Sequence, residues 1–166
     1  MNYTLRKAEK KEITVAFNLL KSAAKTLSNK NIEQWRYWAD PPIEKIKWVE
    51  DGFNKNEFFF IESLSSTLLG MVRVSEEDLL YWGKLNDRSQ YIHSLVILEA
   101  FSGQNIGSDV IKTIVKQAKK NNFNFLRLDC DSSNKQLCQY YINQGFTQVG
   151  KKKLALGLYN LYQMNI

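Results

Sequence analysis

Cysteine, proline and glycine are all scarce in this chain. Its 166 residues include only 2 Cys, 2 Pro and 8 Gly, while 44% of its side chains are hydrophobic. This composition excludes collagen-like, low-complexity and linker-rich chains. A chain of this length buries about 70% of the surface that it exposes when unfolded, so it needs neither a disulfide nor a structural metal for stability. We therefore expect a single domain spanning residues 1–166.

Residue types that bind metals are also few. Cys130 and Cys138 are eight residues apart, and His93 is the only histidine. A structural zinc site combines several cysteines and histidines at short, fixed spacings, which this chain does not offer. We expect two ordinary thiols and no metal.

Long hydrophobic runs are missing as well. No run approaches the roughly 18 residues of a membrane-spanning helix. Residues 1–11 mix charged and apolar side chains and contain no apolar segment of the signal-peptide type. With its unpaired cysteines, the chain is predicted to be cytoplasmic and to have no membrane partner.

The charge balance is positive: 23 Lys and Arg against 17 Asp and Glu give a net charge of +6. Such a balance favours anionic ligands, which include nucleic acid and phosphate-bearing cofactors, but it also suits an ordinary soluble surface. The basic residues are scattered, and Lys151-Lys152-Lys153 is the only triple run. We therefore predict no nucleic-acid partner.

Alternating and helical hydrophobic patterns predict an α/β (α+β) fold. Strands are expected at residues 3–7, 57–64, 68–74, 90–97, 124–130, 147–153 and 158–165. Helices are expected at residues 13–27, from Asp40 onward, at about 106–121 and at about 134–144. For the second helix we expect Asp40 as the N-cap and a buried face of Ile43, Ile46, Val49 and Phe53.

A strand, a turn with glycine and a helix start follow one another at residues 91–108. The first N–H groups of a helix have no intrahelical acceptor and point outward at the positive end of the helix dipole. This arrangement suits a phosphate group. Gly103 and Gly107 alone are weak evidence for such a site, because glycine at a strand-to-helix turn is often only a steric convenience.

A second set of residues follows: Asn134, Tyr141 seven residues later, and Gly145-Phe146. With the strand Leu95-Val96-Ile97 and the turn after it, this set resembles the acetyl-CoA signature of the GCN5-related N-acetyltransferase (GNAT) superfamily. That signature is a Leu-Ala-Val strand, a loop Gln/Arg-x-x-Gly-x-Gly/Ala, and an Asn and Tyr seven residues apart before Gly-Phe. The resemblance, carried by about residues 90–150, implies a mostly antiparallel mixed sheet with about four helices and a splay between its two central parallel strands.

The resemblance also implies where acetyl-CoA binds. It places Ser102 at the Gln/Arg position, Asn105 at the first glycine and Gly107 at the last, so the first two depart from the signature. The residues implied to bind the cofactor are Leu95, Val96 and Ile97 along the pantetheine arm, Ser102, Gly103, Gln104, Asn105, Ile106, Gly107 and Ser108 at the pyrophosphate, and Asn134 and Tyr141 near the thioester.

Acetyl transfer to an amine needs a neutral nucleophile, a stabilised oxyanion and a proton for the departing thiolate. The resemblance points to Tyr141 as the acid, because a phenol with a pKa of about 10 is protonated at neutral pH. The oxyanion donor is expected among the strand amides, with Val96 as first choice. His93, nine residues before Ser102 as in arylalkylamine-type members, is one candidate base; a water chain ending on Glu99 or Asp129 is the alternative.

Aromatic residues outside the signature suggest an acceptor site. Trp35, Trp38 and Tyr81 are the candidates to bind the substrate, although aromatic clusters also form cores. The resemblance implies that the acceptor is a primary amine of a small molecule, or of a peptide or protein, and that it reacts in a ternary complex. The alternative function is that of an acyl-CoA sensor without catalysis. The strands at the C-terminus also offer an edge through which a homodimer could form.

Overall fold

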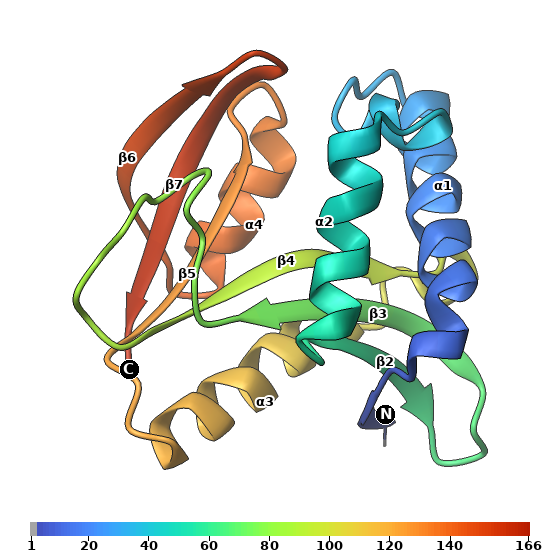
Figure 1. Cartoon of the computed structure of the whole chain (residues 1–166), viewed down its shortest axis with the longest axis horizontal. Helices are drawn as coiled ribbons and strands as arrows, with labels where there is room; N and C mark the ends of the chain where they lie inside the picture. The colour runs from blue at the N-terminus through green and yellow to red at the C-terminus, as the bar shows by residue number, and fades with distance from the viewer. Residues whose placement is uncertain (1–2) are drawn as a thin grey trace. The chain divides into compact units, whose positions relative to one another are not determined.

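The computed structural model describes residues 3–166 (Figure 1). Its strands are β1 Tyr3–Lys7, β2 Phe58–Ser63, β3 Leu68–Ser75, β4 Ser89–Ile97, β5 Phe125–Asp131, β6 Thr147–Leu154 and β7 Gly157–Asn165. Its α-helices are α1 Ile13–Asn29, α2 Ile43–Asn54, α3 Ile106–Lys120 and α4 Lys135–Asn143, and the short 3-10 helices are η1 Lys10–Glu12, η2 Arg36–Ala39 and η3 Glu99–Phe101. Each strand and α-helix predicted from the sequence is present, with its ends shifted by at most a few residues.

The strands form a mixed sheet in the order β1-β2-β3-β4-β5-β7-β6. β1 with β2, β2 with β3, β5 with β7 and β6 with β7 are antiparallel pairs. β4 and β5 are parallel, and their register runs from Ser89 opposite Phe125 to Tyr91 opposite Arg127. The predicted fold class, a mostly antiparallel mixed sheet with one central parallel pair and four α-helices, is confirmed.

The chain forms two compact units, and β4 contributes to both. The first unit contains the residues up to Val74 together with Ser94–Gly107; the second contains Ser75–His93 and Ser108–Ile166. The expectation of a single domain stays a prediction. No helix within residues 3–166 has the length and hydrophobicity to cross a membrane.

Helices α1 and α2 lie side by side in the first unit (Figure 1) and build its core with β2 and β3. Leu20 of α1 and Val49 of α2 are fully buried, and so are Phe60 of β2 and Met71 of β3. Each burial of such a side chain contributes about 1.5–3 kcal/mol. The helical stripe and the alternating strand pattern of the sequence therefore converge on one apolar cluster.

The start of α2 differs from the prediction. Asp40 follows η2, and Pro42 occupies the N-cap position, so α2 begins at Ile43. Ile43 is 57% exposed and Ile46 is partly buried, whereas Val49 and Phe53 are buried as predicted. The predicted apolar face was wrong at Ile43 because this residue lies in the first turn, at the end of the stripe that packs on the core.

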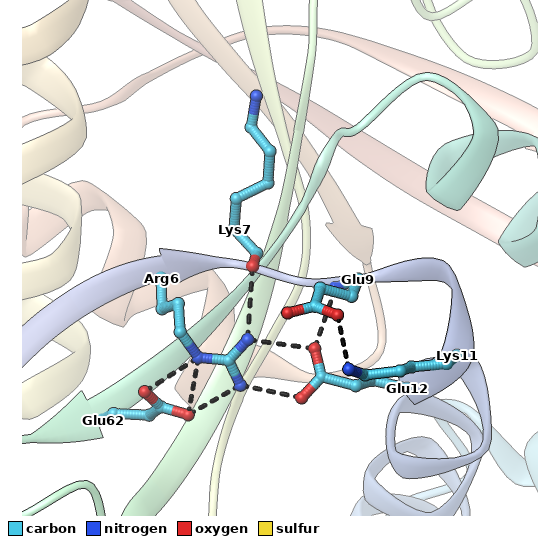
Figure 2. Close-up of polar contacts among 6 residues, drawn as sticks. All are labelled: Arg6, Lys7, Glu9, Lys11, Glu12 and Glu62. Atoms are coloured by element: carbon cyan, nitrogen blue, oxygen red, sulfur yellow. Dashed lines mark hydrogen bonds and ion pairs between the residues drawn. The ribbon is translucent and has the colours of Figure 1, made fainter.

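Arg6 joins three elements at the edge strand of the first unit (Figure 2). Its guanidinium donates to Glu62 of β2 at 2.8 Å and to Glu12 of η1 at 2.8 Å. These paired, charge-assisted hydrogen bonds raise the pKa of Arg6 above its ordinary value, with Glu12 as the larger cause and Glu62 the next. The network ties β1 to its only neighbouring strand and fixes the turn that leads into α1.

Candidate active site

The second half of β4 lies very close to β3 in the first unit. A Cβ added to Gly70 would meet the carbonyl oxygen of Val96 at 2.0 Å, and the amide of Leu98 donates to the carbonyl of Leu69 at 2.9 Å. Val96 and Leu98 therefore direct their backbone groups toward β3. Because successive residues of a strand point their N–H and C=O groups to opposite edges, Leu95 and Ile97 direct theirs away from β3.

Ser94 interrupts the regular strand just before these residues. Its φ of 49° lies in the left-handed region, which is unusual for a residue other than glycine. Such a residue inside a strand locally breaks the ladder and turns the strand that follows. The irregularity coincides with the point at which β4 passes from the second unit to the first.

The turn before α3 contains two residues in the left-handed backbone conformation. Gly103 and Asn105 have φ values of 76° and 60°, and residues 102–105 are exposed. Asparagine is one of the few side chains that tolerate the left-handed region, so Asn105 takes the conformation that a glycine would take there. The turn leads directly into the first residue of α3, Ile106, and the outward N–H groups of the helix start are suited to a pyrophosphate.

Asn134 and Tyr141 lie on α4 in the second unit. Asn134 caps this helix: its side-chain oxygen accepts the amide hydrogen of Leu137 at 3.1 Å. The predicted spacing thus places Asn134 at the N-terminus of α4 and Tyr141 two turns further along the same helix.

Tyr141 is buried among aromatic rings. Its ring contacts Tyr140, Phe146 and Tyr162, with centroids 5.4 to 6.1 Å away. Burial raises the pKa of the Tyr141 phenol far above its ordinary value, and the neighbouring Cys130 and Tyr140 raise it further. The phenol is therefore fully protonated throughout the neutral pH range.

Cys130 and Cys138 are free thiols, as predicted. Their sulfur atoms are 3.5 Å apart, and both side chains are buried. Burial raises the pKa of Cys130 well above its ordinary value, with the hydrogen bond to Cys138 as the second cause. The pair acts as small packing groups between β5 and α4.

His93 lies between two carboxylates in the second unit. Its Nε2 is 3.9 Å from the Oδ2 of Asp78, and one side-chain atom each of Asp78, His93 and Asp129 lies within 4.8 Å of the others. The parallel register explains the position of Asp129. Tyr91 pairs with Arg127, so His93 and Asp129, each two residues further on, share that face of neighbouring strands.

Arg127 anchors the long loop between β3 and β4 to the same face. It donates to both carboxylate oxygens of Asp87, at 2.7 and 2.8 Å, and its guanidinium lies 4.9 Å from the ring centre of Trp82. Arg127 holds the pKa of Asp87 below its ordinary value by this hydrogen bond. In Figure 1 this loop runs beside β5 and β7.

The predicted aromatic residues lie in different surroundings. Tyr81, on the loop, stacks edge to face with Tyr159 of β7 at 5.1 Å, and Asp131 is the register partner of Tyr159. Trp38 is buried in the core of the first unit, and Trp35 packs against that core while partly exposed. Packing therefore accounts for Trp38, whereas Tyr81 lies in the unit of His93.

The two alternative bases belong to different units. Asp129 belongs to the group around His93, whereas Glu99 lies in the first unit, where it accepts a hydrogen bond from Thr26 of α1 at 3.4 Å. Sequence reasoning missed Asp78 and Tyr159. No spacing rule marks them, because Asp78 lies in an irregular loop and Tyr159 reads as an ordinary strand residue.

Comparison with known proteins decides the family. A model of the acetyltransferase (GNAT) family matches residues 24–146, which include the strand, the turn and the Asn134–Tyr141 helix. The chain belongs to the GNAT acetyltransferase family. It is accordingly an acyltransferase that uses acetyl-CoA, and its relatives transfer acetyl groups to amines.

Solved structures of GNAT acetyltransferases share this fold over almost the whole chain. One from Listeria monocytogenes is 26% identical, has a TM-score of 0.81, and aligns over 99% of this chain and 95% of that one. The Vibrio cholerae spermidine N-acetyltransferase, in complex with CoA and spermine, is 19% identical with a TM-score of 0.69 over 99% and 95% of the two chains. The aminoglycoside acetyltransferase AAC(6')-Ib, in complex with coenzyme A and kanamycin, is 15% identical with a TM-score of 0.73 over 99% and 95%. No curated protein sequence matches the chain.

Proposed function

We propose that this GNAT protein acetylates a primary amine of a small molecule by direct attack in a ternary complex. The observation that carries the proposal is the left-handed conformation of Gly103 and Asn105 in the turn before α3, which Asn105 adopts although it stands at a glycine position of the signature. Acetyl-CoA supplies an acetyl group activated as a thioester. The backbone N–H groups of residues 103–108 and the side chain of Ser102 would hold its pyrophosphate.

The strand amides are proposed to bind the pantetheine arm and the developing oxyanion. The carbonyl of Val96 faces Gly70 of β3, which argues against our first choice of the Val96 amide as oxyanion donor. The alternation of the strand supports the amides of Leu95 and Ile97 instead, since these point to the other edge of β4. The side chain of Val96, which is almost fully buried, would contribute packing.

Proton transfer is assigned to His93 and Tyr141. An acceptor that arrives as an ammonium ion loses two protons when its nitrogen becomes an amide. His93 would take the first proton and pass it to solvent. Tyr141 would give its phenolic proton to the departing sulfur and would be reprotonated by the second proton from the nitrogen. With Asp129 beside His93, a relay through this carboxylate stays the alternative for the base.

The acceptor is proposed to lie near the rings of Tyr81 and Tyr159 in the second unit. Asp131 pairs with Tyr159 in the sheet, so carboxylates and aromatic rings lie together there. Both group types attract a cationic amine. Two of the structural relatives are in complex with amines, spermine in one and kanamycin in the other. This argues for a small amine over a peptide. Location in the cytoplasm, the absence of a metal and a homodimer stay predictions.

Calorimetric titration with acetyl-CoA, followed by a free-thiol assay against a library of amines, tests this function. Saturable binding and amine-dependent release of thiol are expected. Binding without thiol release for any amine would instead indicate the acyl-CoA sensor, and failure to bind would refute the proposal.

Substitution of Asn105 tests the turn. We expect Asn105→Gly to keep the affinity for acetyl-CoA within about threefold, and Asn105→Val to weaken it by about tenfold, because a branched side chain in the left-handed region costs roughly 1–2 kcal/mol. Calorimetry on both variants provides the comparison. Equal affinities for glycine and valine would show that this residue does not shape the cofactor site.

Removal of the imidazole tests the base. His93→Ala should move the acidic limb of the pH–rate profile toward alkaline pH, because an unassisted amine keeps its proton up to about its own pKa, near 10 for an alkylammonium such as lysine. Initial rates from about pH 6 to 10 would measure the shift. A profile that superimposes on the wild type would transfer the role to Asp129 or water.

A further inference from the structure

We propose that Asp78 is a positioning residue that acts through His93 by stabilising its protonated form, while fixing the loop that carries Tyr81. This inference rests on the proposed function, in which His93 is the base. Asp78 lies in the irregular segment after β3, where no motif of the sequence marked it.

The two carboxylate oxygen atoms of Asp78 make different contacts. Oδ1 accepts the backbone N–H of Tyr81 at 3.0 Å, and the backbone carbonyl of Asp78 accepts the N–H of Trp82 at 3.0 Å. These bonds close a turn whose geometry depends on the Asp78 side chain. Oδ2 faces the Nε2 of His93 at 3.9 Å.

The pair is shielded from solvent. The side chain of Asp78 is 5% exposed and that of His93 is 10% exposed. Charges interact more strongly in such surroundings than at the surface, so the carboxylate favours an imidazolium over a neutral imidazole. A base whose protonated form is stabilised in this way takes a proton from the acceptor more readily.

Other charged groups near His93 come from neighbouring strands. Asp129 of β5 completes the group of three. Arg127, two residues earlier on β5, forms an ion pair with Asp87. Tyr159 of β7 lies within the field of Asp131 and Asp129; burial is the main cause that raises its pKa, and these two carboxylates raise it further. Of the three residues in the group, Asp78 is the one that lies on the loop and accepts the N–H of Tyr81, so its charge and its hydrogen bond can be separated by substitution.

The single histidine of the chain allows a direct measurement. In tag-free protein labelled at histidine, NMR reports the imidazole of His93 alone, without any need for turnover. We expect the titration midpoint of Asp78→Asn to lie about one pH unit below that of the wild type. Asparagine keeps the acceptor for the Tyr81 N–H, so the loop is retained while the charge is lost. Asp78→Ser, which also keeps an acceptor, serves if the asparagine variant does not fold.

Asp87→Asn is the matched control. It removes a carboxylate from the same loop, but one that pairs with Arg127 rather than facing His93. An unshifted midpoint for Asp87→Asn beside a lowered one for Asp78→Asn supports the proposal. An unchanged midpoint for Asp78→Asn, or an equal shift in both variants, overturns it.

Kinetics then connects the contact to the reaction. With an amine that the wild type acetylates, Asp78→Asn should move the acidic limb of kcat to lower pH and lower its plateau several-fold, with little change in KM for acetyl-CoA. In the His93→Ala background, Asp78→Asn should have no further effect on the limb. If Asp78→Asn shifts the acidic limb in the His93→Ala background as much as it does in the wild type, Asp78 does not act through His93. If no amine is acetylated at all, the proposed function fails, whereas the NMR titration still decides the contact.

Discussion

Tyr141→Phe should lower turnover by about 100-fold or more while leaving the affinity for acetyl-CoA unchanged, in the range expected for a positioned general acid. Its phenol is buried, and its pKa is raised far above the ordinary value. The proton is therefore present throughout the neutral range, and in the proposed reaction it passes to the departing thiolate. Phenylalanine keeps the contacts with Phe146 and Tyr162 and removes only the hydroxyl group.

Tyr140→Phe provides the control for this substitution. Tyr140 precedes Tyr141 on α4 and lies 3.4 Å from the hydroxyl of Ser108. It carries the same functional group in the same helix, but the resemblance gives it no catalytic role. Turnover of the two variants should differ by about the full effect of the acid, whereas calorimetry should give the same affinity for acetyl-CoA in both. Turnover of Tyr141→Phe equal to that of the wild type would remove Tyr141 from the mechanism.

Gly107→Val should abolish detectable binding of acetyl-CoA, a loss of about 100-fold or more, which corresponds to about 2.7 kcal/mol. Gly107 is the second residue of α3 and is only partly buried, so the branched side chain would project where the proposed cradle holds the pyrophosphate. Backbone N–H groups bind phosphate well only where the backbone can be approached closely. Calorimetry would give the affinity, and circular dichroism would confirm that the variant folds.

Gln117→Val is the matched control for Gly107→Val. It places the same β-branched residue in α3, on an exposed position near the other end of the helix. Any general weakening of the helix by valine should appear in both variants. Normal affinity in Gly107→Val would count against a phosphate site at this turn.

Much of this protein is predictable from local patterns. The hydrophobic stripe at Leu20 and the alternation in β2 and β3 depend on periodicities that the chain itself carries, and they predict the elements correctly. The spacing from Asn134 to Tyr141 likewise places both residues on one helix. The ends of the helices were less predictable. Asp40 is a residue type that favours the N-cap position, but α2 begins after Pro42.

The amino-acid sequence by itself determined the elements, their order and the family signature, because these depend on residue type and on spacing along one segment. The tertiary structure decided which groups meet across segments. Asp78 lies 3.9 Å from His93 although the two residues belong to different segments, and Val96 can turn its carbonyl to β3 because Gly70 has no side chain. Such contacts depend on loop closure and strand register, which no local pattern encodes.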